Sequence, residues 1–355
     1  MPIEELTLLC NRAISLAEDL CLDAARSVLE QAEGRLRGHD HRCKGLVEAA
    51  WCRFFDLSGD RRAAASHGRQ AIRLLENYGS EDEAAAALIY MGAALSRRGE
   101  YLGSLNLFNR AVTLLRGSSD HRLTVMARWG LGSTLALLER YHEARGSLLA
   151  AEARSHSLPS LVQRGRLQKS AGLACLHCGD LARAEPLLSR ALRAFEAAGR
   201  VELLADVCNS IGTLRLFAGD RDAARESYRR AIRLLQGRPC PALAEAYYEL
   251  AYWELSGSGA VPGSAARAAD HALCALRVAR RLGSDVEVAR SALALGQALV
   301  ALEKPEAAIP PLQRASALFR RRSLTLSAVV AEDMLKWAES RSQGSRRSPP
   351  SPGLH

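Results

Sequence analysis

A pattern of small residues recurs along this chain at a nearly constant spacing, and it restricts the fold more than any other feature. A small residue stands in the same local context seven times, at Ala64, Ser104, Ala144, Ala184, Ala224, Ala268 and Ala308. Neighbouring copies are 40 residues apart, except for one spacing of 44 between Ala224 and Ala268. Seven residues after each copy comes an alanine, and four residues after it comes a mostly larger residue. A fixed period of this length predicts a stack of similar units, each a pair of helices.

Glycines mark the ends and the contact points of these helices. A glycine stands twelve residues before five of the seven small residues, at Gly92, Gly132, Gly172, Gly212 and Gly296. A second kind of glycine precedes aspartate, as in Gly219-Asp220. Such a pair predicts a left-handed helix end followed by an N-cap. In the sixth unit, it places one helix over residues 201–217 and the next over residues 221–235.

The three small positions of each unit resemble those of the tetratricopeptide repeat. In that family, a small residue on the first helix (helix A) lets the second helix (helix B) approach closely. Two small residues on helix B admit its own helix A and the next one. Gly212, Ala224 and Ala231 match these three positions. The period is 40 rather than the family's usual length of about 34 residues, which predicts longer helices.

The resemblance implies an all-α fold, a right-handed superhelical solenoid of about eight helix pairs over residues 1–340. The pairs are expected near residues 1–38, 39–79, 80–117, 118–158, 159–199, 200–237, 238–283 and 284–322. A capping helix over residues 323–339 should shield the last apolar face. The Ser-, Pro- and Arg-rich residues 341–355 are expected to be disordered. Residues 257–263, rich in glycine and serine, lengthen one turn and predict a mobile loop.

Charge and cysteine content limit the kinds of partner and the cellular compartment that we expect. The net charge is +9, but the arginines are scattered along the helices rather than gathered in one basic block, which does not favour nucleic-acid binding. Nine cysteines, most of them in helical patterns, predict a reducing compartment. The first residues show no cleavable leader pattern, and no stretch is long and apolar enough to span a bilayer. The sequence therefore predicts a cytoplasmic protein with no membrane contact.

The sequence predicts no enzyme, no cofactor and no metal site. It contains no nucleophile elbow, no phosphate-binding glycine loop and no HExxH motif. Two short groups have spacings close to those of metal ligands, Cys175–Cys178 and the trio His39, His41 and Cys43. The first pair falls at helix positions that are small or apolar in other units, so packing is the favoured interpretation. The trio has no second cluster to complete a site.

In tetratricopeptide proteins, the A helices line a concave groove that holds the ligand. Transferred to this register, the family's groove positions select polar donors and aromatic anchors. The candidate groove residues are Arg53, Trp129, Arg166, Lys169, Asn209, Phe217, Tyr248, Tyr252 and Gln297. The same offsets also select Asp56, Arg97, Asp206, Glu245 and Arg290, among others.

These features predict a non-enzymatic adaptor that binds a peptide or protein segment in the groove. The long period and the uninterrupted stack resemble the repeat domains of bacterial Rap-like and MalT-like regulators. That resemblance implies an alternative, a sensor that controls a transcription factor or signalling partner in response to a peptide. Nucleic-acid binding through the Arg-rich convex surface is the third and least favoured function.

Overall fold

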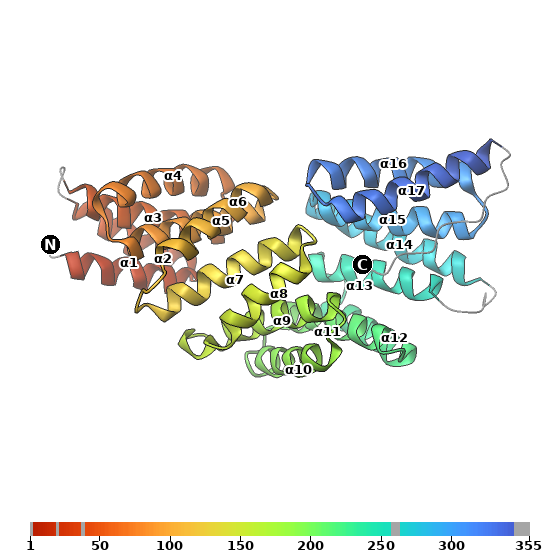
Figure 1. Cartoon of the computed structure of the whole chain (residues 1–355), viewed down its shortest axis with the longest axis horizontal. Helices are drawn as coiled ribbons and strands as arrows, with labels where there is room; N and C mark the ends of the chain where they lie inside the picture. Colours follow the sequence, from red (N-terminus) through yellow and green to blue (C-terminus); the bar gives the residue numbers. More distant parts are fainter. Residues whose placement is uncertain (1–2, 19–20, 37–39, 257–262, 344–355) are drawn as a thin grey trace. The chain divides into compact units, whose positions relative to one another are not determined.

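The computed structural model describes residues 3–18, 21–36, 40–256 and 263–343. All regular secondary structure in these ranges is helical (Figure 1). The predicted all-α fold of stacked helix pairs is confirmed. The chain divides into two compact units, Met1–Leu158 and Pro159–His355, which we call unit 1 and unit 2.

Unit 1 consists of four helix pairs and a short 3-10 helix. Its elements are α1 (Ile3–Glu18), α2 (Leu22–Gly34), α3 (His41–Ser58), α4 (Arg61–Tyr78), α5 (Glu81–Arg97), α6 (Tyr101–Leu114), α7 (His121–Leu137), α8 (Tyr141–Glu152) and η1 (Ser155–Ser157). The odd-numbered α-helices are the A helices. Each packs against its own partner, and α1, α3 and α5 also pack against the next A helix.

Unit 2 consists of four further pairs and a last A helix. Its elements are α9 (Leu161–His177), α10 (Leu181–Ala197), α11 (Val201–Phe217), α12 (Arg221–Leu235), α13 (Pro241–Leu255), α14 (Ser264–Leu282), α15 (Asp285–Ala301), α16 (Pro305–Arg321) and α17 (Thr325–Ser342). Successive A helices again pack against each other, whereas successive B helices of the described chain make no comparable contact. The A helices therefore form one continuous side of each unit, which we call the A-helix face.

The repeated glycine brings helices A and B together. A Cβ atom added at Gly132 would lie 2.5 Å from Leu148, and one added at Gly172 would lie 2.9 Å from Leu188. Both leucines are fully buried. The same contact joins Gly92 to Phe108, Gly212 to Tyr228 and Gly296 to Leu312. Each large residue is four residues after the small residue of the register, so the glycine and the large side chain are a matched pair.

In one repeat, the small residue and the large residue of this contact exchange helices. Counted from the start of its helix, Tyr252 on α13 occupies the position of Gly212 on α11. Ala272, four residues after the repeated small residue Ala268 on α14, corresponds to Tyr228, four residues after Ala224 on α12. Tyr252 packs against the cluster that contains the fully buried Ala272. The large side chain at this contact therefore comes from helix A instead of helix B. For this reason, the core accepts a tyrosine where other repeats need glycine.

The predicted helix ends are also observed. Gly219 has φ of +83°, and the Asp220 side chain accepts a hydrogen bond from the Ala223 amide. The helix before this turn spans residues 201–217 and the helix after it spans residues 221–235, as predicted. The Gly-Asp pairs at Gly59 and Gly179 likewise combine a positive φ with a capping aspartate.

Two further expectations meet the limits of the described chain. The capping helix is present as α17, which continues through Arg341 to Ser342. The rest of the predicted tail, residues 344–355, lies outside the described residues, as do residues 257–262 of the predicted loop. The domain boundaries and the mobility of the loop thus stay predictions.

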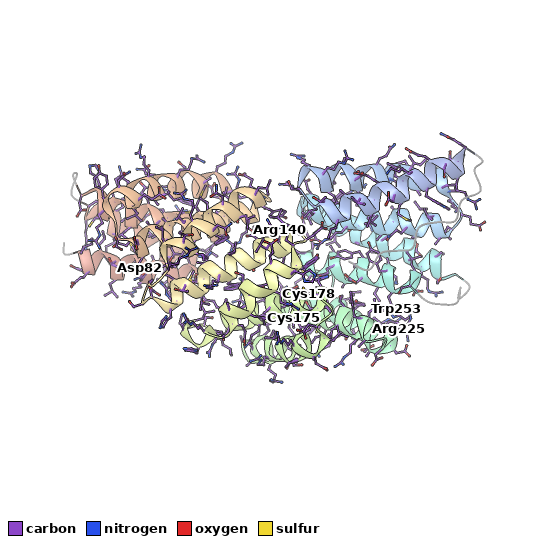
Figure 2. All side chains as sticks on the ribbon, in the orientation of Figure 1. Asp82, Arg140, Cys175, Cys178, Arg225 and Trp253 are labelled. Atoms are coloured by element: carbon purple, nitrogen blue, oxygen red, sulfur yellow. The ribbon has the colours of Figure 1, made fainter. Side chains whose placement is uncertain are left out.

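Hydrogen bonds and cation–π contacts fix the end of α13, just before the inserted segment. Trp253 Nε1 donates to the Arg221 carbonyl at 2.7 Å, and Arg221 Nη2 donates to the Trp253 carbonyl at 2.6 Å. The Arg221 guanidinium lies 4.9 Å from the centre of the indole ring. The Arg225 guanidinium lies 5.0 Å from it, and Figure 2 labels Arg225 and Trp253. Cation–π contacts and two hydrogen bonds therefore join the start of α12 to the end of α13.

Six of the nine cysteines are buried and pack as small apolar residues, whereas Cys21 is exposed. Cys52 and Cys175 are fully buried, and burial raises the pKa of the Cys52 thiol to about 12. Such a thiol stays protonated, unlike a thiolate nucleophile or metal ligand. No group of three His, Cys, Asp or Glu side chains within the described ranges could hold a metal ion. His39, one of the trio considered above, lies outside those ranges.

Candidate functional site

Ionisable side chains gather on the A helices of unit 2. Four carboxyl groups, which we call the carboxyl cluster, come from α11 (Asp206), α13 (Glu245 and Glu249) and α15 (Glu287). The charges of the other three act on Glu245, as does the charge of Lys169 from α9. The cluster is notable on a chain whose net charge is +9.

Lys169 joins the first two A helices of unit 2. Its Nζ atom lies 2.6 Å from Asp206 Oδ2, and both side chains are largely covered, at 19% and 25% exposure. Burial alone would lower the pKa of Lys169, but the attraction of Asp206 and Glu245 outweighs it and the pKa is raised. Lys169 is thus a fixed positive charge between α9 and α11.

Glu249 is held by a tyrosine from helix B of the preceding repeat. The hydroxyl of the fully buried Tyr228 donates to Glu249 Oε2 at 3.3 Å. The same hydroxyl lies 3.2 Å from Thr213 Oγ1 on α11. Burial raises the pKa of Glu249 to about 7, although Arg290 and the hydrogen bond from Tyr228 oppose the shift. This carboxyl therefore titrates near neutral pH.

Arg290 links α13 to α15. Its Nη1 atom donates to the Tyr248 hydroxyl at 3.3 Å and lies 3.8 Å from Glu287 Oε1. The other oxygen of Glu287 is buried and has no hydrogen-bond partner within the described chain. Burial raises the pKa of Glu287 despite Arg290. The Tyr248 and Tyr252 rings meet edge to face, with centres 6.5 Å apart.

The carboxyl of Glu245 is surrounded by three other carboxyl groups and one positive charge. Burial raises the pKa of its carboxyl, and repulsion from Asp206, Glu287 and Glu249 raises it further, while Lys169 opposes the shift. Lys169 and Arg290 are two positive charges among four carboxyls, so the carboxyls cannot all ionise without cost in this partly dehydrated site.

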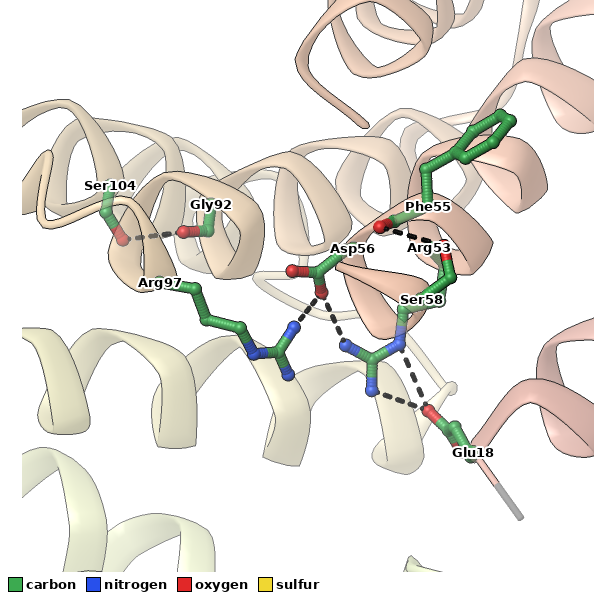
Figure 3. A network of polar contacts seen from close by, with 8 residues as sticks. All are labelled: Glu18, Arg53, Phe55, Asp56, Ser58, Gly92, Arg97 and Ser104. Carbon is green, nitrogen blue, oxygen red and sulfur yellow. Dashed lines mark hydrogen bonds and ion pairs between the residues drawn. The ribbon is translucent and has the colours of Figure 1, made fainter. Parts of the chain in front are cut away.

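Unit 1 carries a different network on its A helices (Figure 3). Arg53 on α3 donates to Glu18 Oε1 at 2.8 Å and to Asp56 Oδ2 at 3.2 Å. Arg97 on α5 also pairs with Asp56, whose side chain is only 2% exposed. The Arg53 guanidinium lies 5.9 Å from the centre of the Tyr90 ring. Here arginines from two helices share one buried carboxylate.

The structure places the nine candidate groove residues in three environments. Arg53 and Trp129 belong to unit 1 and are half-buried. In unit 2, Arg166 is exposed, while Lys169, Phe217 and Tyr252 are half-buried. Asn209, Tyr248 and Gln297 are 0%, 4% and 3% exposed. Lys169, Tyr248 and Tyr252 are brought to the carboxyl cluster, whereas the Asn209 amide instead donates to the Ala242 carbonyl.

Sequence reasoning missed Glu249 and Glu287. Counted from the start of each helix, Glu249 on α13 has the same position as Lys169 on α9 and Asn209 on α11. The groove offsets were transferred to α13 one residue too early, which selected Tyr248 in its place. The register could therefore have found Glu249. Glu287 is in the first turn of α15, where a carboxylate is common for helix-dipole reasons.

The sequence matches no family model and no curated protein. Solved structures share its fold. A Rap protein complexed with competence and sporulation factor aligns with a TM-score of 0.67 at 12% identity, over 97% of this chain and 100% of that one. NprR in complex with its cognate peptide NprX aligns with a TM-score of 0.67 at 13% identity, over 95% and 98%. Aspartyl phosphate phosphatase F from Bacillus subtilis aligns with a TM-score of 0.55 at 12% identity, over 92% and 95%.

The matched small positions and these alignments lead to one identification. The chain has the tetratricopeptide-repeat fold. At such low identity, the likeness carries the fold and no activity. Within the described residues, no helix is both long and apolar enough to cross a membrane.

Proposed function

We propose that this tetratricopeptide-fold chain is a non-enzymatic adaptor that binds a peptide or an extended protein segment. The binding surface is the A-helix face, with its centre in unit 2 around Lys169, Glu249 and Tyr252. One observation carries the proposal: the carboxyl cluster and its basic and aromatic neighbours gather on α9, α11, α13 and α15. Hydrogen-bonding groups beside aromatic rings suit an extended segment, whose backbone groups and side chains both need partners.

Two of the aligned structures support this function by analogy. The Rap protein is complexed with competence and sporulation factor, and NprR with its cognate peptide. The apo form of NprR from B. thuringiensis is named a quorum sensor, with a TM-score of 0.58 over 89% of this chain. That name favours a second candidate, a sensor that controls a transcription factor or signalling partner when a peptide binds.

Nucleic-acid binding through the B helices has less support. Several B-helix arginines are already paired with glutamates of the preceding repeat. Arg230 on α12 lies 2.8 Å from Glu196 on α10, and Arg110 on α6 pairs with Glu76 on α4. A phosphate backbone would have to displace these carboxylates, so the available positive charge is smaller than the net charge suggests.

Arg166 and Lys169 offer a direct test of the binding face. A ligand is first selected from an array of extended peptides drawn from the proteome of the source cell, and its affinity is measured by isothermal titration. Arg166→Gln and Lys169→Gln should each weaken binding about tenfold, because each removes a charge at the surface of the cluster.

The matched control is Arg193→Gln, which removes the same charge from an exposed position on the B helix α10. It should bind like the wild type. Thermal unfolding of each variant checks that the fold is retained. Equal affinities for Arg166→Gln, Lys169→Gln and the control would refute the A-helix face as the binding surface.

A further inference from the structure

The carboxyl cluster lies where consecutive repeats meet. Asp206 is on α11, Glu245 and Glu249 are on α13, and Glu287 is on α15, and these three helices pack in that order. Each repeat of a solenoid contacts only its neighbours, so a repulsion at one junction is not averaged over the whole molecule. The charge state of the cluster therefore acts directly on the contact of α13 with α11 and α15.

The polar contacts at these junctions are few and specific. Tyr228 holds Glu249 and Thr213, and so ties α13 to α12 and α11. Arg290 holds Tyr248, and so ties α15 to α13. Lys169 neutralises Asp206 from the far side of α11. This leaves Glu245 and Glu249 with no full positive charge bonded to them among the contacts of the described chain.

We propose that the carboxyl cluster is a proton-operated switch in the packing of unit 2. When Glu245 and Glu249 of the cluster hold their protons, α13 packs closely between α11 and α15. When they lose them, the unneutralised carboxylates repel each other and loosen α13 from its neighbours. The proposal needs no ligand, so it stands or falls separately from the proposed function.

The charged and titratable groups that act on the two central carboxyls come from α9, α11, α12 and α15 and from α13 itself. Asp206, Lys169 and Glu287 act on Glu245 from α11, α9 and α15, and Glu249 acts on it from α13. Arg290 from α15 and Tyr228 from α12 act on Glu249. Arg166 acts on Lys169, and the buried hydroxyls of Tyr248 and Tyr252 border the carboxyls. Among these groups, Glu249 has a pKa of about 7 and Glu245 has a pKa of about 8, so these two carboxyls change charge near neutral pH.

The direction of the effect follows from the raised pKa values. The pKa of Glu249 is about 7 in the folded chain, against the ordinary value of 4.5. Between these values the folded state binds more protons than the unfolded state, so stability falls as pH rises through this window and stays low above it. Glu245 and Glu287 shift in the same direction and add to the loss.

Hydrogen exchange of the full chain tests the switch. Amide protection along α13 is compared at about pH 6 and about pH 8, after correction for the intrinsic exchange rate. We expect protection in the wild type to fall about tenfold at the higher pH, while α5 in unit 1 changes less than about twofold. Equal protection of α13 at both values would overturn the proposal.

Glutamine variants separate this switch from general pH effects. Glu245→Gln/Glu249→Gln mimics the protonated carboxyls and should keep α13 protected at about pH 8. Glu306→Gln, at an exposed position on α16, is the matched control and should behave like the wild type. A double variant that loses protection like the wild type would contradict the proposal. Carbon-13 titration of the glutamate carboxyls in unmodified protein gives an independent readout, and ordinary acidic midpoints for Glu245 and Glu249 would also overturn it.

Discussion

Gly212→Leu is expected to destabilise unit 2 by about 3 kcal/mol. A Cβ atom at Gly212 would lie 2.5 Å from Tyr228 Cε1, and leucine adds three further carbons. The Tyr228 ring cannot swing away, because it is fully buried and its hydroxyl is bonded to Thr213 and Glu249. Helices α11 and α12 would have to separate. Chemical denaturation followed by circular dichroism measures the loss.

A second substitution tests whether the two residues are a matched pair. Tyr228→Ala alone should cost about 3–5 kcal/mol, because it leaves a large cavity. Gly212→Leu/Tyr228→Ala should cost at least about 2 kcal/mol less than the sum of the two single changes, because leucine fills part of that cavity. Tyr252 and Ala272 already show this reversed arrangement in the next repeat. Additive losses would mean that the two side chains do not compete for the same space.

Gly146 provides the control for these experiments. It lies within α8, and an added Cβ would meet nothing within 4 Å. Gly146→Leu should therefore be neutral or stabilise unit 1 by up to about 1 kcal/mol, since glycine is a poor helix former. A large loss at this site would show that the damage at Gly212 comes from a general effect of an added leucine, such as reduced solubility, instead of from packing against Tyr228.

The same glycines explain why so much of the fold could be predicted from the sequence. A close helix contact needs a small residue at one position and a large one at another, and both recur at a fixed spacing. The helix contact can therefore be predicted from Gly212, Ala224 and Tyr228, and the turn between the helices from Gly219-Asp220. Local chemistry dictates each of these features, so no knowledge of distant parts of the chain was needed.

The candidate site was less predictable. The position of a residue in the repeat indicates which face of the helix it occupies, but not how deeply its side chain is buried. Asn209 and Lys169 share one register position, yet Lys169 is half-buried beside Asp206, while Asn209 is fully buried and bonded to the Ala242 carbonyl. The long lysine side chain carries its ammonium group to a partly exposed position beside Asp206, whereas the short Asn209 side chain stays within the contact between α11 and α13. Gln297 is similarly covered, with both amide atoms unpaired within the described chain.

The carboxyl cluster illustrates a second limit. Asp206 and Glu245 were selected by the groove offsets, but the same offsets were applied to α13 one residue early and missed Glu249. Moreover, a single glutamate on a helix is an ordinary solvated residue. Its unusual pKa arises only when three helices bring Asp206, Glu245 and Glu287 to the same place. That convergence depends on packing between repeats that are 40 residues apart, and no local pattern expresses it.

Removing the buried carboxylate of unit 1 should have an effect of similar size to the glycine change. Asp56→Ala is expected to destabilise unit 1 by about 3 kcal/mol, because a buried ion pair that loses one partner leaves the other charge uncompensated. The Asp56 side chain is 2% exposed and bonds both Arg53 and Arg97. Arg53 is itself 13% exposed and would keep only Glu18, so it cannot recover its hydration without opening the contact between α1 and α3.

Two neighbouring substitutions establish that burial of the charge is the cause. Arg97→Gln should cost less than about 1 kcal/mol, because the Arg97 side chain is 43% exposed and its charge is screened by water. Asp56→Asn keeps the shape of the side chain but removes its charge, and it should fall between the other two. Denaturation followed at α3 by hydrogen exchange ranks the three variants. If Arg97→Gln were as damaging as Asp56→Ala, the exposed ion pair would matter as much as the buried one, and the network would have to be stabilised by its geometry instead of by compensation of buried charge.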